Sequence, residues 1–197
     1  GRKRDMIYGH FTGEKKKRAV PEIKTAAVIG AGLAGVNIAA ELTSRGLQVD
    51  LYEKKYPGAA GSGNLRGLFN PRFTVSRGPV SDFYATAFSS AFRKFKAMDE
   101  IDFHPCGSLH LFTDAEKEKR LKGSAENWSW HEDHMRVVSV EEASAIAGVK
   151  IETQALYLPE AGFVNPAKIC EKLSSSLSLM NEKIETITYL ENTWLVN

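Results

Sequence analysis

The sequence predicts an α/β fold, and three consecutive segments near the start of the 197-residue chain carry that prediction. Residues 23–29 contain the short apolar run TAAVI, which is typical of a buried strand. A glycine turn follows, and residues 33–45 then space their apolar side chains as a helix does. Residues 47–53, LQVDLYE, alternate apolar and polar side chains like a second strand. Together they have the size of one β-α-β unit.

Helices and strands alternate after this unit. Residues 57–78 are rich in Gly, Ser, Asn, Pro and Arg and are expected to form a long loop. An aromatic helix is expected over residues 80–98, with a stripe of Phe and Tyr that is typical of core packing. The other expected elements are strands at 107–112 and 155–158, helices at 115–121, 139–147 and 165–179, and two final strands at 183–190 and 193–196.

The glycine turn, residues 30–35, has the sequence GAGLAG and so matches the pattern GxGxxG. This pattern alone occurs by chance, but here it follows a predicted strand and opens a predicted helix. An acid, Glu53, ends the next strand eighteen residues past Gly35. The context predicts a Rossmann-like dinucleotide site. The alternative is a tight strand-to-helix turn without a ligand.

Each position of the motif has a physical role. Gly30 permits the tight turn, Gly32 lets a pyrophosphate approach the backbone, and Gly35 lets the helix pack closely on the strands. The helix N-terminus offers unpaired N–H groups and a partial positive charge to the phosphates. Glu53 can accept hydrogen bonds from the ribose hydroxyls and disfavours a 2′-phosphate, so FAD or NAD is expected rather than NADP.

The motif does not separate FAD from NAD, but the segment after Glu53 favours FAD. Residues 58–67, GAAGSGNLRG, are small and polar and could follow an extended cofactor with their backbone N–H groups. By composition alone, a mobile surface loop is the other interpretation.

Composition predicts a globular protein and excludes several classes. Hydrophobic residues make up 43% and charged residues 25% of the chain. Residues 1–20 carry a net charge of +5, which leaves −3 for the remainder of a chain with formal net charge +2, so the body is not a basic nucleic-acid binder. Cys106 and Cys170 form no ligand cluster, no apolar stretch is long enough to span a bilayer, and a reducing cytoplasm is expected.

At this point the sequence resembles a known family. The segments AAVIGAGLAGVNIAAEL, VDLYEK and GAAGSGNLRGLFNPRF are similar to the FAD-dependent half of bacterial bifunctional proteins that make 5-methylaminomethyl-2-thiouridine in tRNA. Three further segments match in order, SDFYATAFSSAFRKF, FHPCGSLHL and LYLPEAGFVNPAKICEKL. The first residues, GRKRDMIYGHF, resemble the last strand of the methyltransferase half. The family belongs to the D-amino-acid-oxidase-like flavoproteins.

The resemblance implies that the cofactor is FAD. It places the ADP half at the glycine turn and Glu53, and the adenine near Ile184 or Ile187 in the strand after the return helix. Four loop residues would lie near the pyrophosphate and the isoalloxazine: Ser62, Gly63, Asn64 and Gly67. The complete expected set is Gly30, Gly32, Leu33, Ala34, Gly35, Glu53, Lys54, Ser62, Gly63, Asn64 and Gly67.

The resemblance also implies a division into four parts. Residues 1–20 would be a basic linker and the end of a preceding methyltransferase domain, and residues 21–79 the first segment of an FAD-binding domain. Residues 80–160 would be part of an α+β substrate domain that interrupts it, and residues 161–197 its return segment. Because the family's oxidase half continues further, the chain is interpreted as a fragment that is inactive alone.

The implied activity is oxidative removal of the carboxymethyl group of 5-carboxymethylaminomethyluridine at the tRNA wobble position, giving 5-aminomethyluridine. A fused S-adenosylmethionine-dependent methyltransferase would then form 5-methylaminomethyluridine, so tRNA and this domain are the expected partners. No catalytic residue is assigned, although Arg66, Arg72 or Arg77 could pair with the substrate's carboxylate. His131 and His134 lack the further ligands of a metal site, and no metal is expected.

Two rival functions stay open. A free glycine or D-amino-acid oxidase of the same fold would share every cofactor residue, but it has no reason to carry the methyltransferase-like start GRKRDMIYGHF. A cofactor-free RNA-binding module that uses the basic arm is the second rival, and bound flavin would exclude it.

Overall fold

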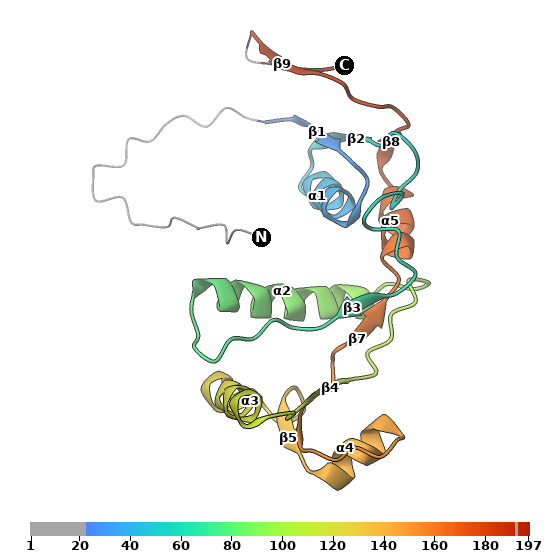
Figure 1. Cartoon of the computed structure of the whole chain (residues 1–197). Coiled ribbons are helices and arrows are strands. Elements are labelled where there is room, and N and C mark those ends of the chain that lie inside the picture. Colours follow the sequence, from blue (N-terminus) through green and yellow to red (C-terminus); the bar gives the residue numbers. More distant parts are fainter. Residues whose placement is uncertain (1–22, 192) are drawn as a thin grey trace, which may run out of the picture.

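The computed structural model describes residues 23–191 and 193–197, so the basic arm expected at residues 1–20 lies outside the described part. Figure 1 shows the described chain in three levels. A parallel sheet with two helices forms one end, a long helix beside a two-stranded sheet forms the middle, and a three-stranded antiparallel sheet with two helices forms the other end. Among the described residues, no helix combines the length and the apolar character that a membrane span needs.

The predicted β-α-β unit is confirmed within one or two residues at each end. It consists of β1 (Thr25–Ile29), α1 (Leu33–Ser44) and β2 (Gln48–Tyr52). The two strands are parallel neighbours, and β8 (Ser178–Met180) pairs with β2 in parallel as the third strand. The chain therefore leaves this sheet after β2 and returns to it at β8. This is the α/β fold with an inserted segment that the sequence predicts.

A small apolar core lies between this sheet and its helices. Val36 and Ala39 of α1 pack with Val49 and Leu51 of β2, and all four side chains are buried. Complete burial of one such aliphatic side chain stabilises the fold by about 1.5–3 kcal/mol. The helix α5 (Pro166–Ser174) also contacts α1. This core holds the carboxyl end of β1, and with it the glycine turn, against two helices.

The middle level is built from aromatic rings. It contains α2 (Pro79–Lys96) and an antiparallel pair, β3 (Gly67–Phe69) with β7 (Gly162–Val164). Phe69 stacks on Phe88 of α2 with ring centroids 4.6 Å apart. The aromatic stripe was expected to pack in the core, and this holds for Phe88 but not for Phe83, which is 65% exposed.

The third level is an antiparallel sheet in the order β4-β6-β5. Its core includes Leu121, Trp128, Leu156 and Leu158. A separate hairpin follows β8 along the chain. The bounds of these elements are β4 (Ser108–Leu111), α3 (Ala115–Trp128), β5 (Arg136–Val138), α4 (Val140–Ala147), β6 (Ala155–Leu158), β9 (Ile187–Leu190) and β10 (Thr193–Val196).

Two predicted helix ends are wrong. The helix expected at 115–121 continues to Trp128, because Leu121, Ser124 and Trp128 recur at helical spacing on its buried side. The helix expected over residues 165–179 ends at Ser174. The hydroxyls of the serine run 174–176 each donate to the backbone carbonyl three residues earlier, and such bonds compete with continuation of the helix. Shortly after this run the chain joins the sheet as β8.

Four short strands escaped prediction. β3 lies inside the segment 57–78 that was expected to be loop, and β5, β7 and β8 have only three residues each. Strands of this length are too short to show alternation in the sequence. Gly162 of β7 was also not recognised as a close-contact position, although a Cβ there would overlap the carbonyl oxygen of His104.

Candidate dinucleotide-binding site

The glycine turn connects the carboxyl end of β1 to α1. Gly30 has φ +97°, a conformation that favours glycine, and its N–H donates to the carbonyl of Tyr52 at 2.7 Å. A Cβ on Gly35 would overlap the carbonyl oxygen of Gly30, so α1 passes directly over the turn. The roles that the sequence assigns to Gly30 and Gly35 are therefore met by the geometry.

The N-terminus of α1 leaves donors without acceptors in the helix. The first bond inside the helix runs from the N–H of Val36 to the carbonyl of Gly32, at 3.0 Å. The N–H groups of Leu33, Ala34 and Gly35 precede it and need other partners. Ser62 Oγ accepts from the Leu33 N–H at 3.0 Å, whereas the N–H groups of Ala34 and Gly35 have no acceptor among the described residues and are open to a ligand or solvent. This end of the helix favours an anionic group.

Glu53 lies at the mouth of the same turn. It directly follows β2, and its Oε2 accepts from the Ala31 N–H at 3.0 Å while its Oε1 accepts from the Lys55 N–H at 3.1 Å. The structure thus brings together the acid and the turn, eighteen residues apart in the motif. Lys54, in contrast, is exposed, and no described residue contacts its side chain through a hydrogen bond or ion pair.

The segment after Glu53 folds back over the turn. The Gly58 N–H donates to the carbonyl of Ala31 at 2.9 Å, and a Cβ on Gly58 would lie 3.3 Å from Ala167 Cα in α5. Gly63 is also tightly placed, because a Cβ there would lie 2.8 Å from the Gly58 carbonyl oxygen. These contacts, with the Ser62 bond to α1, argue against a freely mobile loop.

The other predicted loop residues make no hydrogen bond to the glycine turn within the described part of the chain. Asn64 is exposed. Gly67 begins β3, where a Cβ would lie 2.9 Å from Pro166 Cγ. The expected position of Ile184 and Ile187 needs a correction, because the first strand after the return helix is β8, which contains neither residue. Their contact with the adenine stays a prediction. Ile184 lies between β8 and β9, and Ile187 is the first residue of β9.

Two residues that sequence reasoning passed over support the site. Asn181 follows β8, and its amide nitrogen, in the orientation that satisfies it, donates to the carbonyls of Glu53 and Lys55 at 3.1 and 3.2 Å. Cys170 of α5 is buried next to Ser62. Burial raises the pKa of its thiol above the usual value, and the hydrogen bond with Ser62 opposes this only in part. Asn181 belongs to no sequence motif, and Cys170 lies in the family-like segment GFVNPAKIC without having been given a role there.

The candidate substrate arginines do not converge on one point. Arg66 lies over the ring of Phe163 at 4.9 Å, and Arg72 lies over that of Tyr84 at 5.4 Å. Arg77 instead pairs with Asp82, with Nε 3.2 Å from Oδ1. The described residues therefore offer no obvious bidentate clamp for a carboxylate.

The two histidines that the sequence singled out face different acids. His131 Nδ1 lies 3.2 Å from Asp133 Oδ2, and His134 Nδ1 lies 3.2 Å from Glu160 Oε2. Within residues 23–191 and 193–197, no group of three or more His, Cys, Asp and Glu side chains is placed to hold a metal ion.

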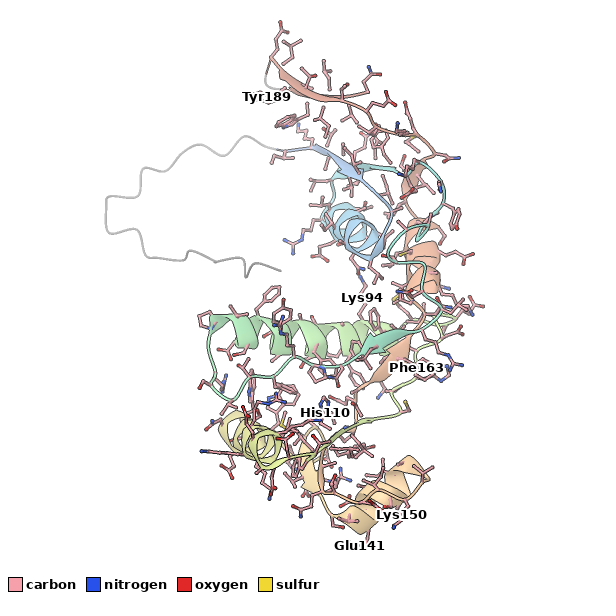
Figure 2. All side chains as sticks on the ribbon, in the orientation of Figure 1. Lys94, His110, Glu141, Lys150, Phe163 and Tyr189 are labelled. Carbon is pink, nitrogen blue, oxygen red and sulfur yellow. The ribbon has the colours of Figure 1, made fainter. Side chains whose placement is uncertain are left out.

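Side chains also connect α1, which follows the glycine turn, to the middle level. Lys94, labelled in Figure 2, extends from α2 toward α1, where its Nζ donates to Asn37 Oδ1 at 2.6 Å. The Asn37 amide in turn donates to the carbonyl of Leu33, in the first turn of α1. A polar chain therefore runs from α2 to the N-terminal turn of α1.

His110 is expected to make the protein less stable in acid. Burial, followed by the charges of Lys117 and Arg120, lowers the pKa of His110 below its usual value of 6.5. Above that pH the ring is neutral in both the folded and the unfolded protein, so its protonation does not change the free energy of unfolding. As the pH falls below 6.5 the unfolded chain takes up the proton first, so stability is lost until the folded pKa is passed. Urea unfolding of the parent and of His110→Gln at about pH 7 and about pH 5 measures this. An equal pH dependence in both proteins would contradict it.

The sequence matches a known family over most of its length. Residues 25–181 match the family described as FAD dependent oxidoreductase. The match begins at the first residue of β1 and ends just after β8. It therefore includes the complete parallel sheet and everything inserted into it.

Curated relatives are similar along the whole chain. The tRNA 5-methylaminomethyl-2-thiouridine biosynthesis bifunctional protein MnmC from Marinobacter nauticus is 29% identical over 201 residues, which cover 100% of this chain and 32% of the relative. The protein of the same name from Nitrosospira multiformis is 31% identical over 202 residues, with the same coverage. The chain thus spans about a third of the length of these relatives.

Solved structures share the fold at lower identity. Glycine oxidase from Geobacillus kaustophilus aligns with TM-score 0.67 and 20% identity, over 88% of this chain and 50% of its own. L-proline dehydrogenase from P. horikoshii aligns with TM-score 0.66 and 21% identity, over 89% of this chain and 48% of its own. At these identities the likeness shows a common fold.

Proposed function

Because the chain belongs to the family of FAD dependent oxidoreductases, we propose that it is part of an enzyme that oxidises a secondary amine with FAD. The observation that carries this proposal is the convergence of three separate segments at the N-terminus of α1. The glycine turn, Glu53 and Ser62 meet there through hydrogen bonds of 3.0 Å. Such a site fits an anionic group flanked by hydroxyls, as in the ADP half of FAD.

Each residue of the proposed site has a separate task. The N–H groups of Ala34 and Gly35 bind the pyrophosphate, and Gly32 leaves room for it. Ser62 keeps the covering loop against α1 and can turn its hydroxyl hydrogen toward a phosphate oxygen. The carboxylate of Glu53 exchanges the Ala31 N–H for the ribose hydroxyls when the cofactor binds. Gly63, Asn64 and Gly67 follow the extended cofactor, and Gly30, Leu33 and Lys54 complete the proposed set.

The proposed substrate is the modified wobble uridine of tRNA. The relatives named as tRNA-modifying bifunctional proteins support this, because they are similar to the chain from end to end. The reaction removes the carboxymethyl group of 5-carboxymethylaminomethyluridine and leaves 5-aminomethyluridine. When bound, the flavin would accept a hydride from the CH₂ between the nitrogen and the carboxylate, giving an imine that water hydrolyses to glyoxylate and the primary amine. A fused methyltransferase with S-adenosylmethionine completes 5-methylaminomethyluridine, and we place the enzyme in the cytoplasm, with its tRNA.

Anaerobic mixing tests the proposed function directly. The protein at its full natural length, with its flavin, is mixed with tRNA that bears 5-carboxymethylaminomethyluridine, and the flavin absorbance is followed. Bleaching that depends on this modified base is the expected result, and mass analysis of the tRNA should show loss of the carboxymethyl group. Bleaching by free glycine but not by the tRNA would instead support a free amino-acid oxidase, and a preparation without flavin would support the cofactor-free module.

Replacing Glu53 by alanine is expected to weaken FAD binding. The change removes a hydrogen bond from a charged acceptor, which contributes about 1.5–3 kcal/mol. The dissociation constant, measured by titration of the apoprotein with FAD, should rise by about tenfold to about 150-fold. Glu41→Ala removes the same charge from the exposed side of α1 and is the control. Equal affinities in Glu53→Ala and the parent would make Glu53 only a surface acid.

A further inference from the structure

A cavity of about 580 Å³ lies between α2 and the segment that follows α3. Its walls include Phe92 and Arg93 of α2, and Trp130 and His134 from beyond the end of α3. None of the residues proposed to bind FAD lines it. The cavity therefore needs an explanation other than the cofactor.

The aromatic wall of the cavity is held in place by packing. The Trp130 ring meets the ring of Phe73 edge to face, with centroids 4.9 Å apart. It also meets the ring of Trp128 edge to face at 6.2 Å and that of His134 at 6.3 Å. Trp130 is only partly buried, so part of its surface faces the cavity. A fixed indole of this kind offers a flat ring a place to stack.

Two donors at this wall have no acceptor in the described part of the chain. The neighbouring Trp128 donates its indole N–H to the carbonyl of Thr74 at 2.9 Å. For the indole N–H of Trp130 and the guanidinium of Arg93, no acceptor is found within residues 23–191 and 193–197. Both donors suit a ligand that is rich in acceptor oxygens.

The acid that lines the cavity, Glu160, already has a partner in His134. Glu160 is only 24% exposed at its side chain, and its Oε2 lies 3.2 Å from His134 Nδ1. His131 lies beside Asp133 in the same way. Arg93 lines the same cavity but forms no ion pair with Glu160 or any other described residue, and its guanidinium favours an anion.

We propose that this cavity binds a nucleotide unit of single-stranded RNA in the tRNA substrate, other than the base that is oxidised. Arg93 and the Trp130 N–H take the phosphate, and the rings of Trp130 and Phe92 take the base. Stacked bases on aromatic rings, with arginine at the backbone, are how proteins hold unpaired RNA. The inference rests on the proposed tRNA substrate. Arg93 also precedes Lys94, which connects α2 to α1, so the cavity lies on the helix that contacts α1.

The test measures binding of 5′-labelled tRNA bearing 5-carboxymethylaminomethyluridine to the full-length protein by fluorescence anisotropy. Arg93→Ala is expected to raise the dissociation constant about tenfold, and Trp130→Phe, which keeps a ring but loses the N–H, about threefold. Arg120→Ala removes an equal charge from an exposed position on α3 outside the cavity and should change affinity less than about twofold. Flavin absorbance reports whether each variant is folded. If Arg93→Ala does not fold, the tRNA affinity of Trp130→Phe tests the proposed site by itself.

Three results would overturn the inference, and they are distinguishable. If tRNA bleaches the parent flavin but both variants bind tRNA like the parent, the cavity is not an RNA site and the proposed function stands. If tRNA neither binds to the parent nor bleaches its flavin, both proposals fall. If UMP displaces the labelled tRNA at concentrations similar to unlabelled tRNA, the cavity is a site for free nucleotides instead.

Discussion

Valine at position 32 is expected to remove most of the FAD from the full-length protein. A Cβ on Gly32 would lie 3.1 Å from Ser62 Oγ, so even the first added carbon is crowded, and the two further methyl groups of valine would extend into the space proposed for the pyrophosphate. Forcing such groups into a packed site costs about 1–3 kcal/mol. The FAD dissociation constant should therefore rise by about fivefold to about 150-fold. Flavin-to-protein absorbance ratios and apoprotein titration measure this.

The same loop contains a matched control for this substitution. A Cβ on Gly61 would meet nothing within 4 Å, and Gly61 does not need a positive φ. Gly61→Val adds an identical side chain beside the same site and should keep the parental flavin content. If Gly32→Val also kept it, the assignment of the glycine turn to the cofactor would be wrong.

Alanine at position 35 is expected to destabilise the fold itself. The added Cβ would overlap the carbonyl oxygen of Gly30, and a backbone atom at the junction of β1 and α1 cannot move aside as a side chain can. The cost should be about 3 kcal/mol or more, at the upper end for overpacking. For a protein of this size that corresponds to a melting temperature lower by about 6–12 °C. Thermal unfolding followed by circular dichroism measures this shift.

The same substitution in another helix should have the opposite effect. Gly123 lies in α3, where a Cβ would meet only Val75 Cγ1 at 3.4 Å. Alanine is preferred over glycine in a helix interior by about 0.8–1 kcal/mol. Gly123→Ala should therefore raise the melting temperature slightly. Equal destabilisation by both substitutions would show that the contact between Gly35 and Gly30 has no special role.

The local part of the fold could be predicted because its signals are local. β1, α1 and β2 were found from apolar spacing and from glycines whose roles follow from the backbone. Asn165 begins the segment expected to be a helix at 165–179, and its Oδ1 caps α5 by accepting from the N–H groups of Ala167 and Lys168. Such bonds join residues two or three apart, so the sequence displays both partners together.

The long-range part could not be predicted in the same way. β3 and β7 pair residues almost a hundred positions apart, and each has only three residues. The contact of Asn181 with Glu53 depends on β8 lying beside β2, which no spacing in the sequence reveals. Ser62 was expected at the cofactor only through resemblance, and its bond to Leu33 arises because the loop folds back. The division of the chain into domains stays a prediction.

The parallel pairing of β2 with β8 has a consequence for biosynthesis. The Glu53 N–H donates to the carbonyl of Met180, so the sheet edge beside the glycine turn is completed by residues made much later. Ribosomes add about 5–20 residues per second, so the roughly 125 intervening residues take on the order of 6–25 s to emerge. During that interval β2 presents an unpaired edge, a hazard for association between nascent chains. Pairing at this edge of the proposed cofactor site must therefore follow translation of α5 and β8.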